Sequence, residues 1–284
     1  MIDTELLEAK PSATSCTSCA AANAGLSALP TPVFALGQVE PRLTRASVER
    51  EFAAVLGRFN SERMLDQQAF HKVISDRSNR YLARNICWVL TVRGIDAYVL
   101  LPRDPVDFDA LIGSVQPIAS SLGICTVIGW KGPLSDPTRC GGLAVPVVSF
   151  EQLLSFRRDE FIGALPLPEG KSAEEFSPLA NELLDRILQL ADNTGATNEH
   201  RALNYLVMRH PPLFETTARC YDRGFSLRSV DVKMSRLSGT RSIVDTIFVF
   251  KSRAGDADEA YFARVDVSDI FPFIVTRLSP YFDR

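Results

Sequence analysis

The last third of the chain carries the pattern that most limits how it can fold. Apolar and polar side chains alternate over residues 230–235, and β-branched and aromatic residues fill residues 244–250 and 261–267. A period of two predicts strands that bury one face, and the short glycine-containing turns between these runs favour antiparallel pairing. We therefore expect a β-meander here.

Helices are predicted immediately before this meander. Ala202 and Leu206 recur at helical spacing after Asn198, a residue suited to an N-cap, and His210-Pro211-Pro212 interrupts the pattern. A second helical segment ends at Gly224. Helices followed by hairpins predict an α+β protein in which antiparallel hairpins and a meander pack against helices.

The composition allows two halves of similar size. With 284 residues and 46% hydrophobic composition, the chain can bury one large core or two small ones. Residues 163–178 hold three prolines and two glycines and are predicted to link an N-terminal α+β half, residues 33–162, to a C-terminal half, residues 179–284. Residues 1–32, poor in core-forming side chains, are expected to form a disordered tail.

The first half is expected to mix strands and helices. The patterns predict a strand at residues 33–39, a hairpin over 86–101, a helix from 104 to 122 and a helix over 150–161. Three aspartates at the start of the predicted helix at residue 104 are interpreted as capping acids, because helix N-termini attract negative charge.

Several short motifs resemble one family. The segments are Arg201-Ala202-Leu203-Asn204-Tyr205, Val230-Asp231-Val232-Lys233, Val265-Asp266-Val267-Ser268-Asp269, Val33-Phe34-Ala35-Leu36-Gly37 and residues 47–57. Together they resemble the C-terminal domain of unknown function of PatG-type cyanobactin maturation proteins, over about residues 33–274.

The resemblance implies a role in maturing ribosomally made, post-translationally modified peptides. The family joins this domain to a subtilisin-like protease, whose Gly-Thr-Ser-x-Ala nucleophile segment does not occur in this sequence. The resemblance supplies no catalytic residue. We therefore expect a non-catalytic scaffold or peptide-recognition protein whose partners are a precursor peptide, its modifying enzymes or a separate protease, in a homo- or hetero-oligomer.

The alternative is a zinc-dependent peptide-modifying enzyme. His210 and Cys220 could join Cys16 and Cys19, the CxxC pair of the tail, with His200 one helix upstream. Thiolate and imidazole are the usual zinc ligands, but a structural site needs four and no second CxxC follows. A buried thiol, surface imidazoles and incidental tail cysteines explain the same residues without metal.

A cluster of cations provides the candidate partner-binding residues. Between Arg219 and Arg253 eight basic residues face three acidic ones. Arg228, Lys233, Arg236 and Arg241 could receive an acidic leader peptide or partner through charge complementarity and strand addition, although a solvated sheet face would have the same composition.

Charge and hydropathy exclude other classes. A net charge of −3 argues against non-specific nucleic-acid binding, which needs a basic face, and no run of 18 apolar residues predicts a membrane helix. The first residues lack the basic start and apolar core of a secretory signal, so we expect a cytoplasmic protein. Its six cysteines then fit reduced, buried thiols better than a disulfide framework.

Overall fold

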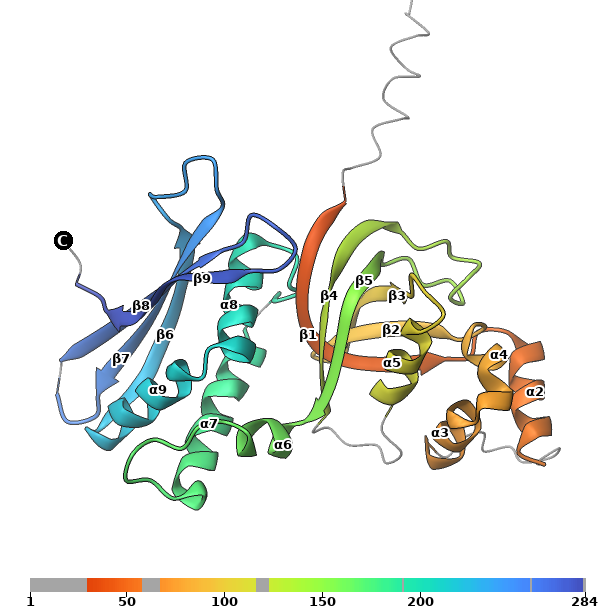
Figure 1. Cartoon of the computed structure of the whole chain (residues 1–284), viewed down its shortest axis with the longest axis horizontal. Helices are drawn as coiled ribbons and strands as arrows, with labels where there is room; N and C mark the ends of the chain where they lie inside the picture. Colours follow the sequence, from red (N-terminus) through yellow and green to blue (C-terminus); the bar gives the residue numbers. More distant parts are fainter. Residues whose placement is uncertain (1–29, 58–66, 116–122, 191, 256, 283–284) are drawn as a thin grey trace, which may run out of the picture.

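The described part of the chain forms an α+β structure with two sheets. The computed structural model describes residues 30–57, 67–115, 123–190, 192–255 and 257–282. Figure 1 shows a barrel and a second unit in which helices cover an open sheet. The predicted fold class is therefore confirmed. Nearly all of the predicted tail, including Cys16 and Cys19, lies outside the described residues.

Five strands close into the barrel, in the order β1-β2-β3-β5-β4. They are β1 (Thr31–Arg42), β2 (Cys87–Val92), β3 (Ile95–Leu101), β4 (Gly123–Leu134) and β5 (Pro146–Arg157). All neighbours pair antiparallel except β3 and β5, which are parallel. The helix α5 (Asp107–Ser114) connects β3 to β4. This strand order is the arrangement of an OB-fold barrel.

The barrel is filled by large apolar side chains. Trp88, Leu90, Leu100 and Phe150 are at most 2% exposed, and the Trp88 indole donates to the Ala83 carbonyl at 3.0 Å. The β1–β2 connection packs helices against the barrel: α2 (Ala46–Val55), α3 (Gln67–Ser75), the 3-10 turn η1 (Arg77–Asn79) and α4 (Arg80–Ala83).

The second unit is the predicted meander with its helices. Its elements are α6 (Arg158–Gly163), α7 (Ala173–Leu188), α8 (Asn198–Arg209), α9 (Pro212–Asp222), β6 (Phe225–Met234), β7 (Ile243–Ser252), β8 (Asp258–Asp266) and β9 (Phe273–Pro280). The strands pair antiparallel in chain order, and Phe248 and Val265 bury one face against Leu206 and Phe214 of the helices. The sequence analysis did not predict β9.

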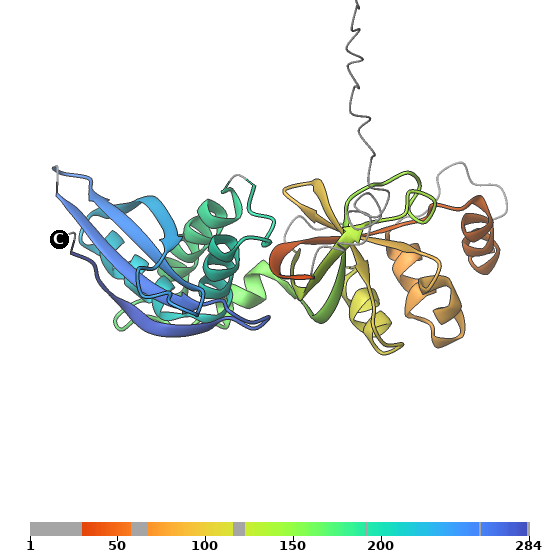
Figure 2. The same cartoon turned by 90° about the horizontal axis from the view of Figure 1, so that it is seen from above.

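The two units contact each other through β1. The Phe34 amide donates to the Gly195 carbonyl at 3.0 Å, and the Asn204 side chain donates to the Phe34 carbonyl at 2.8 Å. Asn204 and Asn193 also exchange side-chain hydrogen bonds. In both views α7 and α8 lie between the open sheet and the barrel (Figures 1 and 2). Buried hydrogen bonds of this kind hold the barrel against the helices.

Two predicted segments differ from the structure, one in type and one in extent. The helix predicted at residues 150–161 is instead the end of β5, followed by α6. A β-bulge where Ile128 pairs with Gln152 and Gly129 with Phe150 leaves Phe150 and Leu153 both buried, which imitates helical spacing. The helix α7 begins at Ala173, inside the predicted linker, because Ser172 and Glu175 form a capping box. The predicted domain boundaries themselves stay predictions.

Candidate functional site

A cavity of about 620 Å³ opens at one end of the barrel. The start of β2, the end of β3 and the loop at residues 135–145 between β4 and β5 surround it. Its apolar lining includes Ile86, Leu101, Phe108 and Val147. In OB-folds this region, between the first and fourth loops, is where ligands bind.

Three arginines from separate segments line this cavity. Arg45 precedes α2, Arg84 follows α4 and Arg139 belongs to the β4–β5 loop; all three are exposed. Within the described residues none of them forms an ion pair. Asp136, the carboxylate in the lining, accepts hydrogen bonds from the Thr138 amide and hydroxyl, each at 2.8 Å, and these bonds hold its pKa below the ordinary value.

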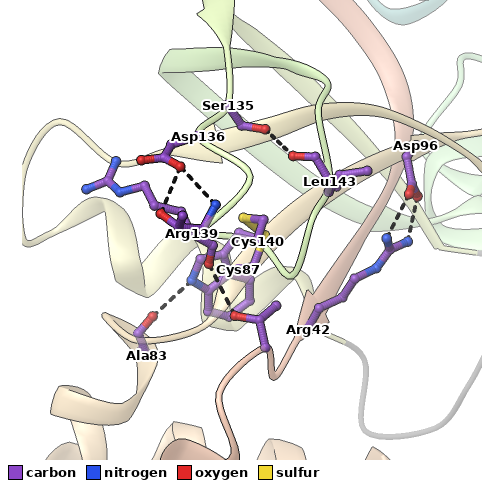
Figure 3. The surroundings of a disulfide bond; sticks show 12 residues. Arg42, Ala83, Cys87, Asp96, Ser135, Asp136, Arg139, Cys140 and Leu143 are labelled. Atoms are coloured by element: carbon purple, nitrogen blue, oxygen red, sulfur yellow. Dashed lines mark hydrogen bonds and ion pairs between the residues drawn. A yellow bond between two sulfur atoms is a disulfide. The ribbon is translucent and has the colours of Figure 1, made fainter.

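A disulfide fixes the loop that carries Arg139. Cys87, the first residue of β2, is bonded to Cys140, and both cysteines are buried (Figure 3). The Thr44 hydroxyl also donates to the Arg139 carbonyl at 3.2 Å. The expectation of reduced thiols is therefore wrong for this pair. The two cysteines are 53 residues apart and meet only because the barrel closes, so no local pattern indicates the bond.

Cys125 and Cys220 are the buried free cysteines of the described chain. Burial raises the pKa of each thiol, so both remain protonated and weakly nucleophilic at neutral pH. The expectation of reduced, buried thiols is correct for these two.

The structure does not bring the described metal candidates together. His210 ends α8, whereas Cys220 lies ten residues further along α9, a helical rise of about 15 Å. Cys220 packs beside the guanidinium of Arg223 and His210 lies near Arg277. No group of three or more His, Cys, Asp or Glu residues that could hold a metal occurs among the residues with described positions.

His200 lies in the first turn of α8, and His210 is the residue that caps its C-terminal end. His200 and His210 each bury one ring nitrogen without a hydrogen-bond partner. Burial is the main cause that lowers the pKa of each imidazole, and the nearby Arg277 lowers that of His210 further. The neutral form is therefore favoured at both positions.

The four predicted partner-binding cations spread along β6 and the β6–β7 turn. Arg228 pairs with Asp258 at 3.2 Å, and Arg241 pairs with the buried carboxylate of Asp266. The Lys233 ammonium lies 5.8 Å from the centre of the Tyr281 ring. Arg236 is exposed and has no ion pair with a described residue.

Further polar and aromatic groups, which were not predicted, lie on the sheet face away from the helices. Arg264 of β8 lies 4.8 Å from the centre of the Phe262 ring and pairs with Asp245 at 2.9 Å. The Phe262 and Tyr281 rings meet edge to face at 5.8 Å. Alternation along β8 places Phe262 and Arg264 opposite the core residues, which is a signal the sequence already contained.

The motif residues of the helix and the last turn stabilise the fold. The Arg201 guanidinium is 1% exposed and donates to the carbonyls of Val267 at 2.7 Å, Ile270 at 3.4 Å and Asp269. Burial lowers its pKa to about 10, so it stays charged near neutral pH. The Asp266 carboxylate accepts from the Ser268 amide at 2.8 Å. These residues tie α8 to the β8–β9 turn and offer no catalytic group.

No helix in the described part of the chain is long and apolar enough to cross a membrane.

Comparisons with known proteins agree with this structure. The family model described as PatG C-terminal matches residues 170–281. A solved structure entitled "PatG Domain of Unknown Function" superposes with a TM-score of 0.68, covering 88% of this chain and 98% of that chain at 18% sequence identity. No curated protein matches the sequence. Residues 170–281 therefore resemble the C-terminal region of PatG proteins, and the described chain shares the fold of the solved PatG domain of unknown function.

Proposed function

We propose that this protein is a non-catalytic accessory protein in the maturation of ribosomally synthesised, post-translationally modified peptides. The PatG likeness supports this context, since PatG-type proteins act in the maturation of such peptides. Its partners would be a precursor peptide and the enzymes or protease that process it. We place it in the cytoplasm with them.

The observation that carries peptide recognition is the open edge of β6. This strand pairs with β7 on one side, and its other edge has no strand partner among the described residues. Unpaired backbone groups along an edge can hydrogen-bond to an extended peptide. Arg228 and Lys233 lie on this strand and Arg236 follows it, so an acidic leader segment would meet complementary charge.

Binding of the precursor peptide to the full chain tests the proposal. Isothermal titration with the leader segment should give a complex that Lys233→Glu/Arg236→Glu weakens, because the added carboxylates repel an acidic peptide. Arg50→Glu/Lys72→Glu makes the same charge change on the exposed surface of α2 and α3 and should leave affinity unchanged. Equal affinities for both double variants would refute the β6 site.

The same sample tests the zinc alternative. Native mass spectrometry of the purified chain reads metal and partner masses together. A chain that binds the precursor without zinc supports the accessory role, whereas stoichiometric zinc with an open coordination position would support an enzyme.

Thiol alkylation in intact cells tests the location. Disulfides persist mainly in oxidising compartments, so an oxidised Cys87–Cys140 pair throughout the cellular pool would count against the cytoplasm.

A further inference from the structure

We propose that the barrel cavity is a second binding site, which takes an acidic peptide segment carrying a branched apolar side chain. Its carboxylates would bind Arg45, Arg84 and Arg139, and the apolar side chain would enter the cavity beneath them. This site is independent of the open edge of β6, because it belongs to the barrel.

The charge of the rim indicates an anionic ligand. Three arginines and one aspartate line the cavity, an excess of two positive charges in a chain of net charge −3. Two other arginines of the barrel are paired with carboxylates: Arg42 binds Asp96 and Arg103 binds Glu151. Asp136 accepts hydrogen bonds from the Thr138 amide and hydroxyl, and the nearby Arg139 also helps to hold its pKa below the ordinary value, so the other two arginines lack a carboxylate partner in the lining.

Apolar side chains share the lining with the arginines. Ile86, Leu101, Phe108 and Val147 contribute to it, and Leu134 at the rim is 63% exposed. Binding sites combine an apolar lining with a few polar groups that fix the orientation of the ligand. A branched apolar side chain would cover this surface while the neighbouring backbone keeps its carboxylates at the rim.

The backbone that carries two of the three arginines is held in place before any ligand binds. The Cys87–Cys140 disulfide anchors the loop that carries Arg139, and the Ser135 hydroxyl bonds to the Leu143 carbonyl at 2.6 Å across that loop. The Thr44 hydroxyl bonds to the Arg139 carbonyl, which places Arg45 beside the same loop. Pre-organised groups lose less conformational entropy on binding.

The cavity is poor in exposed aromatic rings, since Phe108 is only partly exposed in its lining, and this favours a peptide over single-stranded nucleic acid. Such sites stack bases on exposed aromatic rings along a basic groove. Here Trp88 is 2% exposed and its indole nitrogen is bonded inside the barrel, so it presents no stacking face. Carboxylates on a peptide fit the three guanidiniums without requiring such a platform.

The experiment measures fluorescence polarisation of a labelled decapeptide that alternates Glu and Leu, added to the full oxidised chain. Arg84→Gln/Arg139→Gln should weaken binding by about tenfold, since it removes two charged hydrogen-bond donors. Arg50→Gln/Arg77→Gln removes the same charge from exposed positions outside the lining and should change nothing. Circular dichroism checks that each variant keeps its fold.

Three comparisons make the result decisive. The Lys233→Glu/Arg236→Glu variant should keep the wild-type affinity of the cavity for the probe. Failure of the β6 site and failure of the cavity site can therefore be told apart. A Gln-Leu probe should bind at least tenfold more weakly. Equal affinity of the two arginine double variants, equal affinity of the two probes, or tighter binding of an oligothymidylate than of the Glu-Leu probe would overturn the proposal.

Discussion

Breaking the Cys87–Cys140 disulfide should remove a large part of the stability of this protein. The bond closes a segment of 53 residues that contains β2, β3, α5 and β4. In the chain-entropy model such a cross-link lowers the entropy of the unfolded chain by about 14 cal/mol/K, or about 4 kcal/mol at 25 °C. Native domains are stable by only about 5–15 kcal/mol, so the loss is easily measured.

Guanidinium denaturation provides the assay. The oxidised chain is compared with the same chain in a phosphine reductant and with Cys87→Ala/Cys140→Ala. Both should lose about 4 kcal/mol in the free energy of unfolding, and reductant should not affect the double variant further. Alkylation and mass spectrometry verify that the bond is open. A loss below about 1 kcal/mol in fully reduced protein would refute the reasoning, because the unfolded chain would then gain little freedom.

Three further changes test the contacts within the fold. Gly195→Ala should destabilise by about 1–3 kcal/mol more than Gly170→Ala in the same denaturation assay: both glycines have positive φ, but a Cβ at 195 would collide with the backbone of β1 whereas one at 170 meets nothing within 4 Å. Equal losses of stability in the two variants would contradict the close approach of Gly195 to the backbone of β1. Arg201→Leu should cost about 3 kcal/mol, because charged hydrogen bonds to three carbonyls disappear; a loss below 1 kcal/mol would contradict that role. The melting temperature should fall as pH drops below about 6.5, because the lowered pKa values of His200 and His210 mean that the unfolded chain binds more protons there. Replacing both histidines with Asn should reduce this dependence of the melting temperature on pH. An unchanged dependence would contradict the role of the two histidines.

The meander could be predicted because its signal is local. Residues of β6, β7 and β8 alternate with a period of two, and hairpin turns lie between them. The edge strand β9 was missed because apolar Phe273 and Val275 lie on its exposed face, so its sequence lacks the alternation of apolar and polar residues. An apolar run without a clear buried face gives little evidence of a strand.

The barrel and its cavity depend on contacts that no window of sequence contains. β1 pairs with β4 about ninety residues away in the chain, with Val33 opposite Gly129. Arg45, Arg84 and Arg139 come together only after that closure. The four candidate cations of β6 and the β6–β7 turn were found by sequence because they lie close together in the chain. Their partners, such as Asp258 for Arg228, are known only from the folded chain.

The contact between Phe34, Gly195 and Asn204 has a consequence for ligands that are longer than one site. Because it fixes the barrel against the helices, the cavity and the open edge of β6 keep a constant separation. A single peptide with two acidic segments could then occupy both sites, and the second segment would bind at a high effective concentration. The length of chain between the two segments would decide whether this avidity is available, so the protein would select its peptides by spacing as well as by charge.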